Sequence, residues 1–398
     1  MSVLHSKKTQ LWVVSSAAAL MGIGQNGLLV SLPFLVEHSA FSLPTWSILI
    51  AIGSLLFLPS APYWGRYSDK HGPKKVVLQA LIGMAFSFIL LLLFAILSEY
   101  QPSMFEVCLF GLLLSRIIYG CTVSGMVPAC QHWAILLCGA ENRLQAITSV
   151  SIGLSSGRLV GPLIAIIALK FSPYAAMGLM IVFPVIALIA MLFQPIPKLH
   201  IEKDNAVEPL SWLPNKAFLP YLGSGLLLCA AIALLQYSLT PLMGSVTSWS
   251  TPNISDGIGV LLTISAACTF AVQVVVVKNK RITSSHMYRL GAVGLLCGFG
   301  LFLFSNVWVY GLAMAMAASS AALLVPAYTC EATEKRSDAP GSVAGYIAMS
   351  HTVGYGVASL LAFTATMNPL YPIYLCLVFS SLIAVTAYWV TKKQALSH

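Results

Sequence analysis

Long apolar runs separated by short polar stretches fill this chain from one end to the other. A membrane-spanning helix needs roughly 20 apolar residues, and many of these runs reach that length. The pattern therefore predicts an all-α membrane protein with twelve transmembrane helices. The predicted spans are 11–36, 46–64, 76–98, 104–130, 144–169, 174–194, 217–243, 257–277, 287–304, 307–329, 342–366 and 370–391.

Composition supports a membrane protein, since 58% of the 398 residues are hydrophobic and only 8% are charged. The net charge of +9 could indicate a nucleic-acid partner. Most Lys and Arg, however, fall in alternate loops, as the positive-inside rule expects for a chain with both termini in the cytoplasm. We therefore expect the lipid bilayer as a partner and no nucleic acid.

No cofactor, metal or catalytic group is expected. The nine cysteines lie almost entirely in apolar runs without paired ligand spacing, so we interpret them as packing residues. The chain also has no nucleotide-binding loop or nucleophile signature. We therefore expect neither an enzyme nor an ATP-driven pump.

The longest polar interruption falls near the middle of the chain and predicts a cytoplasmic linker between two pseudo-symmetric six-helix bundles. A weak internal repeat agrees, because Pro128 and Gly157 have counterparts in Pro326 and Gly354 at nearly the same offset. Bundles related in this way hold a substrate site near the middle of the membrane. The predicted bundle, linker and second bundle are residues 1–195, 196–216 and 217–398.

The segment between the second and third predicted spans concentrates charges and glycines. Gly72 and Pro73 predict a tight turn, and the basic residues keep it on the cytoplasmic side. Asp69 is the unusual member, because a carboxylate at a helix end can form a latch in one conformation and release it in another. An ordinary positive-inside turn is the alternative. The candidate gating residues here are Gly65, Asp69, Gly72, Lys74 and Lys75.

The fifth predicted span carries a second candidate gating element. Gly157 and Gly161 lie four residues apart on one helix face, where small side chains permit close approach of two backbones. Pro162 then removes a helix hydrogen bond and favours a bend. We expect these three residues to take part in conformational change, with ordinary small-residue packing as the alternative.

These patterns resemble signatures of the major facilitator superfamily. Gly65 and Asp69, with the glycine and basic residues after them, are similar to its loop between the second and third spans. Arg116, followed by Gly120, resembles its fourth-span signature. The resemblance implies two six-helix bundles that transport a small molecule by alternating access, although its motifs cover only the N-terminal half.

The fifth span resembles the signature of exporters and antiporters within that superfamily. Gly157 and the Gly161-Pro162 pair match it, whereas Ala165 and Ile166 replace a glycine pair found there. The resemblance therefore implies export, and the departure leaves the direction of transport to be inferred.

Two arginines fall within predicted spans, where a charge costs roughly 2.5–3.5 kcal/mol unless it meets a partner or water. Arg116 could be a structural residue bonded to neighbouring polar groups, or it could face the substrate. Arg158 is the stronger candidate, because Tyr355 takes its place in the repeat. Neutral polar residues of other spans complete the candidate substrate site: Gln25, Asn26, Gln236, Tyr237, Gln273, His351 and Tyr355.

The distribution of acids bears on the substrate. All twelve Asp and Glu fall in predicted loops or near span ends. Lipophilic cations need a buried acid as partner, whereas guanidinium groups match carboxylates. The candidate site therefore favours an anionic or zwitterionic metabolite. His351 could carry a coupled proton, since imidazole ordinarily titrates near neutral pH, or it could be a hydrogen-bonding group between helices.

Residues and resemblance together predict a monomeric secondary active exporter of a small molecule, coupled to protons. The general likeness is to the bacterial efflux branch, with drug–proton antiporters and carboxylate siderophore exporters such as the vibrioferrin type. It implies a bacterial inner (plasma) membrane. A carboxylate siderophore is our preferred substrate. The alternatives are a multidrug–proton antiporter, an importer of a polar nutrient or metal–chelate complex, and a receptor or scaffold that transports nothing.

Overall fold

The computed structural model describes residues 6–195, 215–278 and 282–395, and these residues form helices joined by short turns. Eleven of the described helical segments are long and apolar enough to cross a membrane. Together with α11 (Ser284–Leu301), whose first turns carry polar side chains, they correspond to the twelve predicted spans. The protein is therefore an all-α, multi-pass membrane protein, as predicted.

The chain divides into two units, and the first contains Met1–Leu210 together with Ser337–Ala348. Its second and fourth predicted spans each consist of two consecutive helices, α2 with α3 and α5 with α6. The helices of this unit are α1 (Lys7–Glu37), α2 (Leu43–Leu55), α3 (Phe57–His71), α4 (Pro73–Tyr100), α5 (Phe105–Val123), α6 (Met126–Cys138), α7 (Arg143–Leu169) and α8 (Ala175–Leu192).

The predicted loop after the second span is much shorter than expected. Because α3 continues to His71, Gly65 and Asp69 are helical, and the turn itself is Gly72. Gly72 has a φ of 91°, a conformation that glycine adopts without the strain of a Cβ. Its N–H donates to the Ser68 carbonyl at 2.9 Å and closes α3. Pro73 then starts α4, as proline favours at the first helical position.

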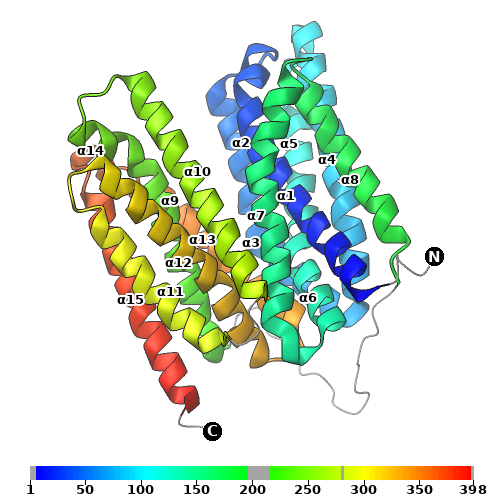
Figure 1. Ribbon diagram of the computed structural model, residues 1–398. Coiled ribbons are helices and arrows are strands. Elements are labelled where there is room, and N and C mark those ends of the chain that lie inside the picture. The colour runs from blue at the N-terminus through cyan, green and yellow to red at the C-terminus, as the bar shows by residue number, and fades with distance from the viewer. Residues whose placement is uncertain (1–5, 196–214, 279–281, 396–398) are drawn as a thin grey trace. The chain divides into compact units, whose positions relative to one another are not determined.

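α1 and α7 cross at close range within the first unit (Figure 1). A Cβ added at Gly157 would overlap the Ala19 carbonyl, and one at Gly161 would lie 2.9 Å from the Ile23 Cα. The two backbones therefore touch through the glycine face of α7. Such contacts matter in a membrane, where dispersion between closely packed helices replaces the hydrophobic effect.

The second unit contains Ser211–Arg336 and Met349–His398, so α13 begins in the first unit and continues in the second. The boundary predicted at 196–216 stays a prediction, because residues 196–214 lie outside the described part. The helices are α9 (Leu219–Val246), α10 (Thr251–Lys278), α11, α12 (Val307–Glu334), α13 (Pro340–Leu361), α14 (Thr364–Met367) and α15 (Tyr371–Ala395).

Candidate functional site

Asp69 lies in the last turn of α3, and its carboxylate accepts three hydrogen bonds from the first turn of α13. Oδ1 accepts from the Gly341 N–H at 2.8 Å, and Oδ2 accepts from the N–H and hydroxyl of Ser342, both at 2.6 Å. Backbone N–H groups at a helix N-terminus lack partners within the helix, and the helix dipole there favours a negative charge. Asp69 thus caps α13 inside the first unit.

Small residues allow α3 and α13 to approach this closely. A Cβ added at Gly65 would overlap the Gly341 carbonyl, and one at Gly345 would lie 3.0 Å from the Pro62 Cα. Gly65 therefore serves the same contact as Asp69, one helical turn earlier. These residues place the carboxylate at the helix end that it caps.

His132, buried on α6, lies beside this contact. Its Nδ1 is 3.5 Å from the Asp69 carboxylate and 2.9 Å from the Ser68 hydroxyl. Within residues 6–195, the side chain recorded in contact with the Asp69 carboxylate is this imidazole. No feature of the local sequence around residue 69 indicates a partner on α6.

Lys74 and Lys75 of the predicted gating segment are not recorded as partners of the Asp69 carboxylate in the described residues. Lys74 Nζ donates to the carbonyls of Leu192 and Gln194 at 3.0 and 2.5 Å, at the end of α8. A cation at a helix C-terminus satisfies free carbonyls and complements the dipole. Lys75 is exposed. Lys74 therefore fixes the end of α8, and Lys75 lies on the surface.

Arg116 is buried on α5, with 3% of its surface exposed. Its Nη2 donates to the Ser87 hydroxyl at 3.1 Å, and its Nε to the Ser115 hydroxyl at 3.4 Å. The guanidinium also lies 5.1 Å from the Tyr119 ring and 5.7 Å from the Phe88 ring. These partners belong to α4 and α5, so the structural interpretation fits Arg116 better than a substrate contact.

Arg158 differs from Arg116 because its side chain is exposed near the middle of α7. Across the described part of the chain, no hydrogen bond or ion pair of its guanidinium is recorded. The exposed apolar Ile166, Leu163 and Ile167 lie about 80°, 140° and 180° away around the helix, at 100° per residue. Arg158 is therefore on a different face from this apolar stripe.

Asn26 meets Arg158 through the backbone. Pro162 has no N–H, so it cannot donate to the Arg158 carbonyl four residues earlier. The Asn26 side chain on α1 donates to this carbonyl instead, at 2.9 Å. The first-span amide predicted to contact substrate thus satisfies an acceptor that the proline releases. Gln25 beside it is half-buried.

The remaining predicted polar residues belong to the second unit. Gln236, Tyr237 and Tyr355 are exposed. Gln273 is buried on α10, and its Oε1 has no hydrogen-bond partner in the described part of the protein. His351 is half-buried, and its Nε2 lies 2.5 Å from the hydroxyl of Tyr328 on α12.

Sequence reasoning missed a buried carboxylate in this unit. Glu331 lies one turn before the end of α12, near a span end as predicted, but only 1% of its surface is exposed. The hydroxyls of Ser284 and Ser285 donate to its Oε1 at 2.7 and 2.8 Å. Glu331 lies three residues after Tyr328, so both are on one face of the helix. This spacing was the sequence signal that could have indicated a buried carboxylate.

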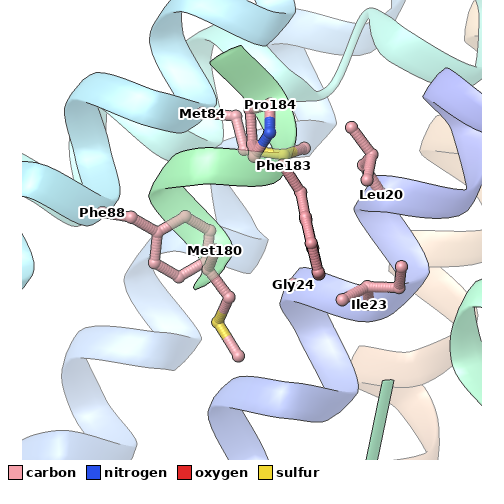
Figure 2. A pocket seen from close by; sticks show the side chains of 8 residues that line it. All are labelled: Leu20, Ile23, Gly24, Met84, Phe88, Met180, Phe183 and Pro184. Atoms are coloured by element: carbon pink, nitrogen blue, oxygen red, sulfur yellow. The ribbon is translucent and has the colours of Figure 1, made fainter. Parts of the chain in front are cut away.

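An apolar hollow lies between α1, α4 and α8 of the first unit. Figure 2 shows the phenyl and thioether side chains that converge on it, with Gly24 at its edge. Phe88 borders both this hollow and the Arg116 guanidinium. The wall carries no polar side chain, so this hollow does not suit an anionic ligand. Its lining residues are Leu20, Ile23, Gly24, Met84, Phe88, Met180, Phe183 and Pro184.

The eleven described segments that can cross a membrane define a multi-pass integral membrane protein. The family model described as Major Facilitator Superfamily matches residues 14–359, and the chain belongs to this family. It is therefore a membrane transporter and not an enzyme.

Two curated relatives match part of the chain. The multidrug resistance protein MdtG of Proteus mirabilis is 28% identical over 165 residues, which cover 40% of this chain and 38% of MdtG. The staphyloferrin B transporter of Staphylococcus aureus is 30% identical over 159 residues, covering 38% of this chain and 35% of that protein. The chain thus matches less than half of each relative's length.

Solved structures show the same fold over nearly the whole chain. The transporter FucP has a TM-score of 0.74 at 11% identity, with 97% of this chain and 99% of FucP covered. The human organic anion transporter MFSD10 has a TM-score of 0.68 at 18% identity, with 96% and 99% covered. A bacterial homologue of the iron transporter ferroportin has a TM-score of 0.71 at 15% identity, with 95% and 98% covered.

Proposed function

We propose that this transporter exports a small anionic metabolite, and that a carboxylate siderophore is its substrate. The observation that carries the proposal is Arg158, an exposed guanidinium near the middle of a membrane-spanning helix. We further propose a monomer in a bacterial inner membrane, with both termini in the cytoplasm and protons as the coupling ion.

A guanidinium at this depth costs roughly 2.5–3.5 kcal/mol unless a partner or water meets it. The Arg116 guanidinium offsets this cost through hydrogen bonds to serines and contacts with aromatic rings. The Arg158 side chain has no recorded partner in the described part of the chain. A planar guanidinium binds a carboxylate through two parallel hydrogen bonds. The acid group of the substrate would therefore complete the partner set of Arg158 during transport.

The two curated relatives suggest two different classes of substrate. The staphyloferrin B transporter supports a siderophore. MdtG supports the second candidate function, multidrug efflux. The buried carboxylate of Glu331 also favours this second candidate, since a desolvated cation needs an acid. Siderophore export needs a cationic group in the site, whereas efflux of cationic drugs needs an acidic one. Substitution of charged residues can therefore distinguish the two functions.

Gating in this proposal depends on the Asp69 cap. Asp69 holds the first turns of α13, and the remainder of that helix belongs to the second unit. Breaking three hydrogen bonds to one carboxylate would release the start of α13. Formation and loss of this cap would then accompany alternating access, with the glycine contact of α1 and α7 as the rigid part of the first unit.

The test compares efflux of two cargos from everted membrane vesicles. One cargo is a carboxylate siderophore, purified after comparing iron-limited culture media of cells with and without the protein. The other is the cationic dye ethidium. Arg158→Lys keeps the charge but loses the two-pronged geometry, so we expect weaker siderophore transport, and a larger loss in Arg158→Gln. Dye movement should change little.

Lys170→Gln is the matched control, because Lys170 is an exposed cation just past the end of the same helix. This variant should transport the siderophore at the wild-type rate. Selective loss of ethidium efflux in Arg158→Gln would refute anion export and support the multidrug candidate.

A further inference from the structure

We propose that the buried polar chain Glu331, Tyr288, Tyr328 and His351 is the proton-coupling centre of this transporter, and that His351 binds and releases the proton. The proposal rests on the transport function above and names the site of its coupling ion. All four residues belong to the second unit. Three of them, Tyr288, Tyr328 and Glu331, are absent from the predicted site.

The geometry of His351 supports proton binding. Nε2 lies 2.5 Å from the buried Tyr328 hydroxyl, while the imidazole itself is half-buried. In the neutral form the hydroxyl donates to the Nε2 lone pair. When a proton from water binds at Nε2, the new N–H donates to the Tyr328 oxygen, and the hydroxyl hydrogen turns to another acceptor. No other bond changes, and release reverses the step.

The remaining groups continue along the facing helices α11 and α12. The Tyr288 ring is 6.3 Å from the Tyr328 ring, and the Tyr288 hydroxyl lies 2.5 Å from Ser224 Oγ. Since the Ser224 hydroxyl donates to the Pro220 carbonyl at 2.9 Å, Tyr288 donates to Ser224. Glu331 follows one turn after Tyr328 on the same helix, and its carboxylate interacts electrostatically with Tyr288.

Charged groups of both signs lie along this chain. Glu331 and Glu334 are carboxylates, whereas Arg289, Lys335 and Arg336 are cations, and the Lys335 amine lies 5.9 Å from the Tyr221 ring. The titratable and charged groups along the chain are Tyr221 and Cys229 on α9, Tyr288 and Arg289 on α11, Tyr328, Cys330, Glu331 and Glu334 on α12, Lys335 and Arg336 directly after it, and His351 and Tyr355 on α13.

The first test needs no cargo. Purified protein that contains isotope-labelled histidine is titrated and followed by infrared or NMR spectroscopy. The signal of His351 is identified as the one that is missing in His351→Asn. We expect this signal to titrate between about pH 5 and 8. Loss of one hydrogen bond or one charge should move its midpoint by about 0.5–1 pH unit in Tyr328→Phe and in Glu331→Gln. Tyr310→Phe, a buried tyrosine of α12 that packs on Phe302, should leave it in place.

The second test uses proteoliposomes with the purified siderophore and ethidium as probes. His351→Asn and Tyr328→Phe should each reduce accumulation driven by a pH gradient by about tenfold. In Tyr328→Phe, which lies outside the candidate substrate site, counterflow exchange needs no net proton movement and should stay within about twofold. If neither probe moves, the export proposal fails and the spectroscopic result still decides the proton site. A His351 signal that does not titrate, or pH-driven transport that survives in His351→Asn, would overturn the proposal.

Discussion

The two units share one helix contact but differ in the residue beside it. In the first unit Gly157 allows α7 to touch the backbone of α1, and in the second unit Gly354 does the same for α13 and α9. The residue that follows is Arg158 in one helix and Tyr355 in the other, and both are exposed. Both units therefore have the close backbone approach, while the polar residue next to it differs.

The buried polar groups of the two units differ in a related way. In the first unit Arg116 lies among serines and aromatic rings, and Asp69 caps a helix end beside the imidazole of His132. In the second unit a histidine, tyrosines and a carboxylate form the buried chain. We infer that the Asp69 cap serves the gate, and we assign the proton to the buried chain of the second unit.

The largest expected effect comes from breaking the shared glycine contact. Gly157→Ala and Gly354→Ala each place a Cβ against a backbone carbonyl of the neighbouring helix. Overpacking of this kind costs about 1–3 kcal/mol, so both variants should melt at lower temperature. Thermal unfolding of the purified protein in detergent measures the effect.

Gly178→Ala and Gly356→Ala are the controls, one in each unit, because an added Cβ at either position meets open space. Both should melt close to the wild-type temperature. If only one of the two test variants were destabilised, the contact would not be a common feature of the repeat.

The fold could be predicted from the sequence because each span must bury its backbone polar groups within a helix, and hydropathy alone locates such segments. The predicted ends were less accurate. α3 runs on to His71 because Ser68 to Lys70 can stay helical up to Gly72, where the positive φ ends the helix. Polar residues beyond the apolar run were therefore assigned to a loop although they continue the helix.

A medium effect is expected at Asp69. Asp69→Asn keeps the shape of the side chain but removes the charge, and hydrogen bonds to a charged group contribute about 1.5–3 kcal/mol. We expect transport to fall by about ten- to a hundredfold at equal protein level. Efflux from vesicles, normalised to the amount of protein in the membrane, measures the loss.

Ser342→Ala sharpens this test, because it removes the hydroxyl donor and leaves both backbone donors to Asp69 in place. Its loss of transport should be smaller than that of Asp69→Asn. Wild-type transport in Asp69→Asn would exclude the cap from the gating mechanism.

The site could be predicted only in part, and the reason is the distance between partners along the chain. Asp69 itself stood out as an acid among cations, but the residues that it caps lie more than 270 positions later. A short-range pattern carries no information about such a contact. The Tyr328 partner of His351 was closer in sequence, yet a tyrosine in an apolar run indicates packing as readily as a hydrogen bond.

The smallest expected effect tests a feature of the first unit alone. Pro162 leaves the Arg158 carbonyl for Asn26 to bind, whereas the repeat position of Pro162 in α13 is Ser359, which keeps its N–H. Asn26→Ala should cost about 1 kcal/mol, the usual net value of one hydrogen bond. Unfolding free energies in detergent measure this change.

Combining Asn26→Ala with Pro162→Ala gives the decisive comparison. Alanine at 162 restores an N–H that can bond to the Arg158 carbonyl within α7, so the carbonyl no longer depends on α1. Asn26→Ala should then cost little, and the double-mutant cycle should show a coupling of about 1 kcal/mol. Additive effects would show that the amide of Asn26 is not needed by this carbonyl. Asn26 would then regain the role of a substrate contact, and the first unit would present two polar groups to the cargo instead of one.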